Sequence, residues 1–136
     1  MRWLLRLVVG LLVLAVLFVG MIFAVSEFGG EVVHLHTVDP SGADHVTHVW
    51  VVDDAGFAWL RSGHSDTGWL TRIEAHPDVV VERAGQTLRM HAEPVRDPAT
   101  RDRIHALMRE KYPVADRIIS AMRDPNGSVP VKLVPR

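Results

Sequence analysis

The chain has 136 residues, carries a formal net charge of −1 and contains no cysteine. Its length suits one domain with one modest core, and the absence of cysteine excludes disulfides, iron–sulfur clusters and thiol nucleophiles. Without Arg2 and Arg6, which precede a long apolar segment, 13 basic residues face 16 acidic ones. This balance argues against a nucleic-acid partner, because nucleic-acid recognition needs a clustered basic surface.

The first element is an apolar segment, Leu7–Val25, of 19 residues without a charged side chain. As a helix it spans about 28 Å, close to the roughly 30 Å of a bilayer's hydrocarbon core. A secretory signal peptide is the alternative, supported by Arg2 and Arg6 and by the small residues at Ala24–Ser26. Signal h-regions run to only about 7–15 residues, so the length favours an uncleaved anchor. We predict a transmembrane anchor at residues 1–26 and a folded domain at 27–136.

The charges that flank this segment predict its orientation. Arg2 and Arg6 lie before it, whereas the first Lys or Arg after it is Arg61. The positive-inside rule then places the amino terminus in the cytoplasm and the domain outside it. The expected protein is single-pass.

Three strands are predicted next, at Glu31–Val38, His45–Val52 and Phe57–Arg61. The first two are β-branched and apolar, and the Asp39–Asp44 segment between them has the composition of a hairpin turn. Connections this short favour antiparallel pairing.

A helix and a hairpin follow. The polar loop Ser62–Asp66 is suited to cap a helix that runs from Trp69 to His76, and Pro77 ends that helix. Strands are then predicted at Val79–Val81 and Thr87–Pro94, the second with Leu88, Met90 and Ala92 on its inner face.

Two helices and a tail complete the chain. Asp97 is predicted to cap a helix that begins at Pro98 and breaks at Tyr112-Pro113. A second, short amphipathic helix is expected from the spacing of Val114, Ile118, Ile119 and Met122. The tail alternates at Val129, Val131 and Leu133, and Pro130 and Pro135 are expected to confine it to a sheet edge.

The order of these features resembles the flavin- and deazaflavin-binding split-barrel proteins, which share the pyridoxamine-phosphate-oxidase-like fold. The resemblance rests on Arg61-Ser62-Gly63, a helix with Trp69 and Arg72, the run His76–Val81, and a strand that ends before Asp97-Pro98. It is nearest to the nitroreductase or quinone-reductase branch. It implies an α+β fold, an antiparallel split β-barrel of six or seven strands with two or three helices. It also implies an FMN or deazaflavin cofactor, hydride or electron transfer to a small oxidised acceptor such as a quinone or nitro compound, and a possible homodimer.

The strongest candidate site begins at Arg61, Ser62 and Gly63. A guanidinium, a hydroxyl, a glycine that permits close backbone approach and a helix start at Ser65–Thr67 together form an anion site. The alternative is an ordinary connection in which Arg61 is solvated or paired with Asp66. The resemblance implies that these residues hold a cofactor phosphate, in which case Arg61→Ala weakens cofactor binding and leaves the fold intact.

Aromatic residues supply the other part of the predicted site. Trp50, Trp59 and Trp69 are available as flat walls for a cofactor ring, with core packing as the alternative role. Trp69 and Arg72 lie three residues apart and therefore share a helix face. The resemblance implies that this face of the helix lies toward the cofactor cleft.

Eight histidines raise the question of a metal site. His34 and His36 share a strand face, and His45 and His48 lie across the predicted hairpin. No sequence pattern of metal ligands accompanies them, so we predict no metal and expect hydrogen bonding instead. A haem ligand is the variant that the resemblance keeps open. The rival to a redox function is a cofactor-free, membrane-anchored binding or scaffolding module on the same fold.

Overall fold

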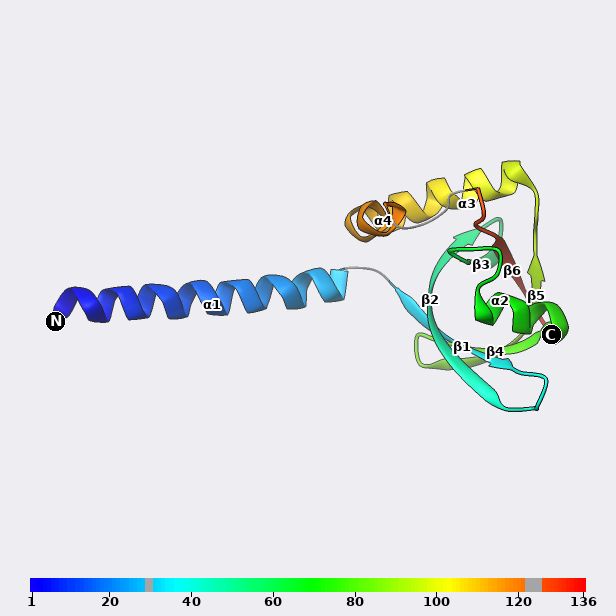
Figure 1. The fold of residues 1–136 in the computed structure, drawn as a ribbon, viewed down its shortest axis with the longest axis horizontal. Coiled ribbons are helices and arrows are strands. Elements are labelled where there is room, and N and C mark those ends of the chain that lie inside the picture. The colour runs from blue at the N-terminus through cyan, green and yellow to red at the C-terminus, as the bar shows by residue number, and fades with distance from the viewer. Residues whose placement is uncertain (29–30, 122–125) are drawn as a thin grey trace. The chain divides into compact units, whose positions relative to one another are not determined.

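The computed structural model describes residues 1–28, 31–121 and 126–136, in two compact units that comprise residues 1–30 and 31–136. The first unit is one helix, α1 (Arg2–Phe28), shown at the blue end of the chain in Figure 1. Within it, Arg2–Met21 is long and apolar enough to cross a membrane. A signal sequence near the amino terminus can have the same length and composition.

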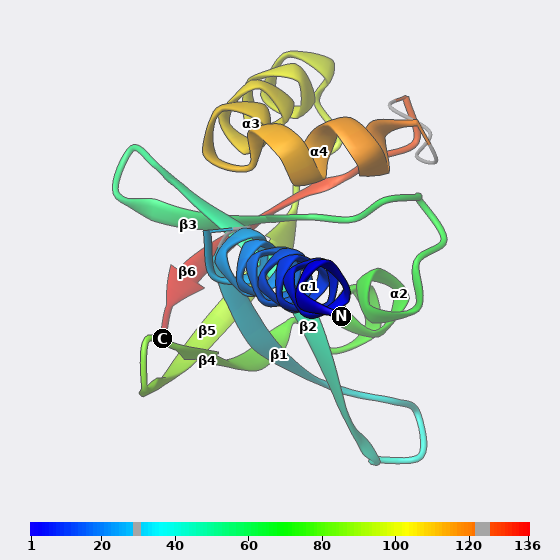
Figure 2. The same cartoon turned by 90° about the vertical axis from the view of Figure 1, so that its left-hand side faces the viewer.

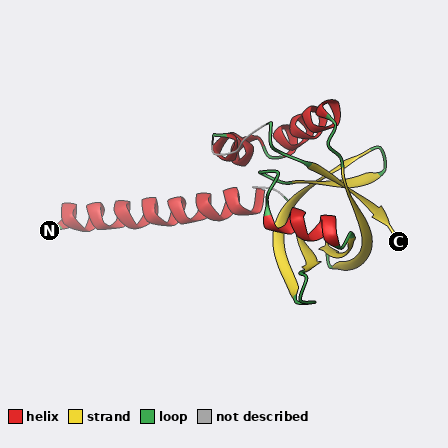
Figure 3. Ribbon diagram, turned by 45° about the vertical axis from the view of Figure 1, so that its right-hand side comes forward, coloured by secondary structure: helices red, strands yellow, loops and turns green. Residues whose placement is uncertain are grey.

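The second unit is built on a closed antiparallel barrel of six strands in the order β1-β2-β3-β6-β5-β4, which confirms the predicted α+β split barrel. The barrel strands, yellow in Figure 3, are β1 (Val32–Val38), β2 (Asp44–Asp54), β3 (Phe57–Arg61), β4 (Asp78–Arg83), β5 (Gln86–Pro94) and β6 (Pro130–Pro135).

Closure of the barrel corrects the expectation that the carboxy-terminal strand is an edge. Leu133 of β6 pairs with Ala58 of β3 and with Ala92 of β5, so β6 lies between two strands. Pro130 and Pro135 are tolerated there because they are the first and last residues of the strand, where the missing N–H interrupts little of the ladder.

The barrel interior forms the main core. Its fully buried side chains include Leu35, Leu60 and Leu133 from the strands, and α2 (Gly68–Ala75) adds Leu70 and Ile73. The predicted inner face of β5 is oriented as expected, although only Ala92 is fully buried and Leu88 and Met90 are half-buried.

The two remaining helices lie together over one side of the barrel (Figures 1 and 2). They are α3 (Pro98–Lys111) and α4 (Pro113–Ser120). The predicted cap is confirmed, since the Asp97 carboxylate accepts a hydrogen bond from the Thr100 N–H at 3.1 Å. Met122, which the sequence assigned to the second helix, lies outside the described residues.

A second core cluster joins these helices to the barrel. It contains Ile104, Met108 and Tyr112 from the helical region, packed on Val52 and Trp59 of β2 and β3. Trp59 therefore belongs to the core rather than to a cofactor wall.

Candidate functional site

A cavity of about 300 Å³ lies where β2, the end of β3, α2, α3 and α4 meet. Its volume is at the lower end of the range for small-molecule sites. It is lined by His48, Val49, Trp50, Arg61, Gly63, Trp69, Met108 and Ile119. The structure thus brings four of the predicted site residues to one cavity, namely Trp50, Arg61, Gly63 and Trp69.

Arg61 is held by a buried ion pair rather than by solvent or Asp66. Its Nη2 donates to Asp116 Oδ1 at 2.8 Å, and the two side chains are only 6% and 2% exposed. Its Nη1 lies 3.1 Å from His105 Nδ1. Neither sequence-based reading of Arg61 included Asp116, which lies 55 residues further along the chain. The expectation that Arg61→Ala leaves the fold intact stays a prediction, and the pair argues against it, because the substitution removes a buried partner of the Asp116 carboxylate.

Trp50 forms one flat wall and is fixed by Tyr112. The two rings stack with centroids 4.8 Å apart and an interplanar angle of 12°. The Tyr112 hydroxyl lies 2.7 Å from the carbonyl oxygens of Val51 and Glu31, and burial raises its pKa above the ordinary value. Trp50 is thus half-buried but held in one orientation, and Trp69 from α2 is a buried second aromatic residue at the cavity.

The approach to α2 is open at Gly63. A Cβ placed on Gly63 would meet no atom of the described residues within 4 Å. Thr67, and not a residue of Ser62–Asp66, is the N-cap of α2, and its side chain makes no capping hydrogen bond within the described structure. Its hydroxyl instead donates to the His64 carbonyl at 2.8 Å. The first-turn N–H groups of α2 therefore lack a side-chain cap beside the cavity.

Two predicted residues serve the fold rather than this cavity. Ser62 is fully buried, and its hydroxyl accepts from the Val129 N–H at 3.0 Å, which ties the end of β3 to β6. Arg72 Nε donates to the buried Thr37 hydroxyl at 2.7 Å and so ties α2 to β1. Their expected contacts with a cofactor stay predictions, and these protein partners give both side chains a role in the fold.

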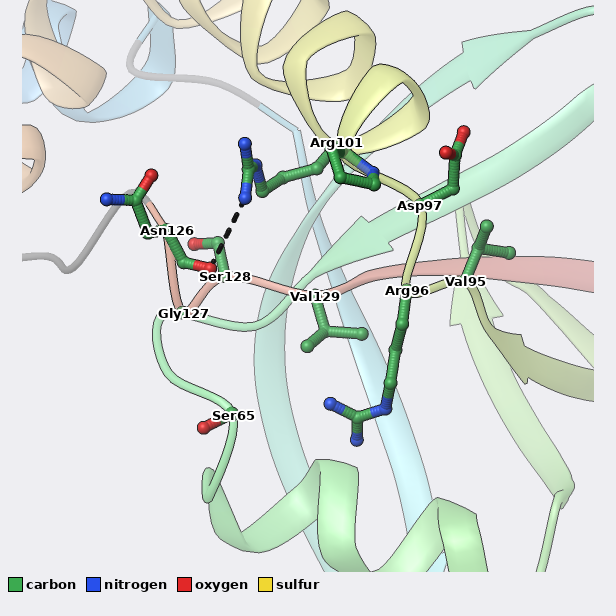
Figure 4. A pocket seen from close by; sticks show the side chains of 10 residues that line it. Ser65, Val95, Arg96, Asp97, Arg101, Asn126, Gly127, Ser128 and Val129 are labelled. Carbon is green, nitrogen blue, oxygen red and sulfur yellow. Dashed lines mark hydrogen bonds between the residues drawn. The ribbon is translucent and has the colours of Figure 1, made fainter.

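Ser65 lines a different cavity, of about 230 Å³, shown in Figure 4. Two arginines also line it, but both have carboxylate partners. Arg96 bonds Glu74, and Arg101 bonds Asp102 at 3.1 Å. Arg101 Nη1 also donates to the Asn126 carbonyl, the dashed line in Figure 4. The charges of this second cavity are therefore largely balanced.

Several of the strand histidines pair with carboxylates or with each other. His36 Nδ1 lies 3.0 Å from Asp44 Oδ2, and His45 Nε2 lies 2.7 Å from Asp39 Oδ2. His34 stacks on His48 with centroids 4.3 Å apart. Among the described residues no group of three or more metal-ligating side chains is arranged to hold an ion.

An ion-pair network at the start of the domain was not predicted. Glu31 accepts from Arg83 through both carboxylate oxygens at 2.9 Å, and Lys111 donates to it at 2.8 Å. Arg83 also makes two bonds to Asp53, at 2.8 and 2.7 Å. Hydrogen bonding to Arg83 lowers the pKa of Glu31 from 4.5 to about 2. This network links the residue before β1 to β2, β4 and α3 by side chains that are far apart in the sequence.

Comparison with known proteins gives matches only among solved structures, since no family profile and no curated protein matches the chain. A putative pyridoxamine 5′-phosphate oxidase from Listeria innocua is 17% identical over 86% of this chain and 92% of its own, with a TM-score of 0.62. An F420 reductase is 20% identical over 82% and 92%, with a TM-score of 0.58. The haem storage protein HutZ from Vibrio cholerae is 19% identical over 83% and 88%, with a TM-score of 0.62.

The fold is the split barrel of these proteins. Identities of 17–20% establish the split barrel and not a reaction, because one fold hosts many functions. The names of these neighbours refer to different ligands, F420 in one and haem in another, so they indicate no single ligand for the cavity of this chain.

Proposed function

We propose that this protein is a membrane-anchored split-barrel oxidoreductase. In this proposal it binds FMN or a deazaflavin in the cavity between β2 and α2 and passes hydride or electrons to a small oxidised acceptor such as a quinone or nitro compound. The observation that carries the proposal is the convergence of Trp50, Arg61, Gly63 and Trp69 on one cavity of about 300 Å³.

The lining residues fit a flat, anionic cofactor. Trp50 and Trp69 offer aromatic surface to a ring, and Met108 and Ile119 exclude water from it. Gly63 leaves room for a phosphate to approach the backbone at the start of α2, where a helix carries about half a positive charge. The cofactor would supply the hydride chemistry, and the protein would supply binding, orientation and exclusion of water.

A cofactor-free binding or scaffolding module remains the alternative function, and the Arg61–Asp116 pair favours it. Asp116 neutralises the Arg61 guanidinium that lines the cavity. In addition, the charge bias around α1 favours a domain outside the cytoplasm, whereas most reduced flavin pools are cytoplasmic.

Cofactor binding is tested by a fluorescence titration of the full chain in detergent micelles with FMN and with a deazaflavin. Trp50→Leu removes one aromatic wall, so we expect affinity to fall about 2- to 12-fold, the equivalent of about 0.5–1.5 kcal/mol. Phe57→Leu is the matched control, because Phe57 lies at the start of β3 and does not line the cavity.

Two outcomes would contradict the proposal. If wild type binds neither cofactor more tightly than about millimolar, or about 4 kcal/mol, the redox function fails and the scaffold takes its place. If Trp50→Leu and Phe57→Leu weaken binding equally, the cofactor binds elsewhere.

The anchor is tested separately. We propose that α1 stays uncleaved with its amino terminus in the cytoplasm, so a phosphatase fused after Arg136 should be active outside the membrane. Activity confined to the cytoplasm would reverse the orientation, and mature protein that begins near Glu27 would show a cleaved signal.

A further inference from the structure

Helix α4 has its polar and apolar faces reversed relative to a surface helix of a globular protein. Asp116 is its buried residue, at 1% exposure, and Ser120, one turn later, bonds Asp116. Val114 and Ile118, also one turn apart, are each 62% exposed, and Ile119 is 37% exposed. Surface helices normally turn their apolar stripe to the core. The exposed face of α4 therefore has the composition of a face that meets an apolar partner.

The start of α4 lies beside the point where the chain enters the domain. Glu31 is the first residue of the domain unit. Its carbonyl lies 2.7 Å from the hydroxyl of Tyr112, the N-cap of α4, and its carboxylate bonds Lys111. The chain's entry and the first turn of α4 thus occupy the same end of the domain.

The sequence limits how far that end can lie from an anchor in a bilayer. Five residues separate Val25, the last residue of the apolar segment, from Glu31. Fully extended chain spans about 3.6 Å per residue, so Glu31 would lie within about 20 Å of the end of the segment. The surface nearest to Glu31 is therefore held near the lipid.

We propose that the exposed face of α4, formed by Val114 and Ile118, rests on the lipid surface of the bilayer that holds α1. Such an interfacial helix buries aliphatic side chains at the boundary between headgroups and acyl chains. The exposed Arg117 beside this face suits anionic headgroups. This inference rests on the proposed anchor, and lipid is its one intended partner.

The test uses the full chain in vesicles of phosphatidylcholine and phosphatidylglycerol. The chain has no cysteine, so Ile118→Cys introduces a single site for an environment-sensitive fluorophore. We expect blue-shifted emission and loss of most of it when the vesicles contain brominated lipids. Ser41→Cys is the matched control, exposed in the turn at the other end of β1, at least about 20 Å from Val32 along the strand. Its label should keep the emission of a label in water.

A third label separates this inference from the anchor on which it rests. Leu14→Cys places the fluorophore inside the apolar segment, and lipid quenching there demonstrates insertion. Quenching at Leu14 with water-like emission at Ile118 would overturn the α4 contact and leave the anchor standing. A blue shift at Ile118 without lipid quenching would show a protein partner and would also overturn it. Loss of quenching at Leu14 would refute the anchor and the α4 contact with it.

Discussion

The buried pair between Arg61 and Asp116 gives the sharpest prediction for stability. Asp116→Asn keeps the side chain's shape but removes the carboxylate that the Arg61 guanidinium bonds at 2.8 Å. The side chains are 6% and 2% exposed, so solvent cannot replace the lost partner. Removing one member of such a pair costs about 3–5 kcal/mol, a large part of the roughly 5–15 kcal/mol that stabilises a domain.

The measurement is urea unfolding of the full chain in micelles, followed by tryptophan fluorescence. A slope of about 2 kcal/mol per molar urea converts this loss into a midpoint shift of about 1.5–2.5 M. Glu74→Gln is the matched control, because its pair with Arg96 is about half exposed and should contribute less than about 1 kcal/mol.

A double variant, Arg61→Met with Asp116→Leu, separates the pair from its members. Both charges are removed together, so most of the lost stability should return. The reasoning is refuted if Asp116→Asn shifts the midpoint no more than Glu74→Gln does, or if the double variant is as unstable as the two single losses added together.

Three further predictions test the barrel, its pH dependence and the cavity. Ala92→Asp should lower the free energy of unfolding by at least about 3 kcal/mol, because Ala92 is 1% exposed. Arg89→Asp, on the outer face of the same strand, should change it by no more than about 0.5 kcal/mol. Equal losses in urea unfolding would mean that the strand register is wrong. Because the pKa of Glu31 is lowered from 4.5 to about 2, the stabilisation by its carboxylate is complete above pH 4.5 and is lost toward pH 2. The unfolding free energy of a Glu31→Gln variant should therefore match that of wild type at pH 2 and fall below it at pH 6. A difference that does not depend on pH would contradict this. Gly63→Ala should leave stability unchanged within about 0.5 kcal/mol but weaken cofactor binding about tenfold or more, and unchanged affinity in the titration would remove Gly63 from the site.

The local features of the fold could be predicted from the sequence because their causes are local. Alternation, turn composition and the Asp97 cap each act within a few residues, and the structure has these elements close to the predicted bounds. The position of β6 could not be predicted in this way. Pro130 and Pro135 indicated an edge, but closure is decided by pairing between β6 and strands far away in the sequence.

The site was only half predictable for the same reason. Side-chain chemistry and the family resemblance pointed to Trp50, Arg61, Gly63 and Trp69, which line the cavity. The partner of Arg61 lies 55 residues away on α4, and the helical pattern there showed two faces without showing which one is buried. In the structure the Asp116 side chain is buried against Arg61 and Val114 and Ile118 are exposed, so α4 turns its acidic residue and not these aliphatic ones toward the barrel.

If the proposed cofactor binds, the same ion pair affects where its phosphate can lie. A phosphate that approached Arg61 would also approach the Asp116 carboxylate, which lies 2.8 Å from Nη2, so attraction and repulsion nearly cancel. The start of α2 beside Gly63 carries partial positive charge, and we expect it to be the better position for the anion. Two variants should then act in opposite directions. Asp116→Asn should destabilise the fold and bind FMN more tightly, because it removes a negative charge beside Arg61, whereas Gly63→Ala should bind FMN more weakly at unchanged stability. The test is an FMN titration of both variants without urea, at a temperature at which each remains folded. Weaker binding by Asp116→Asn would show instead that Asp116 is needed to orient Arg61 toward the cofactor.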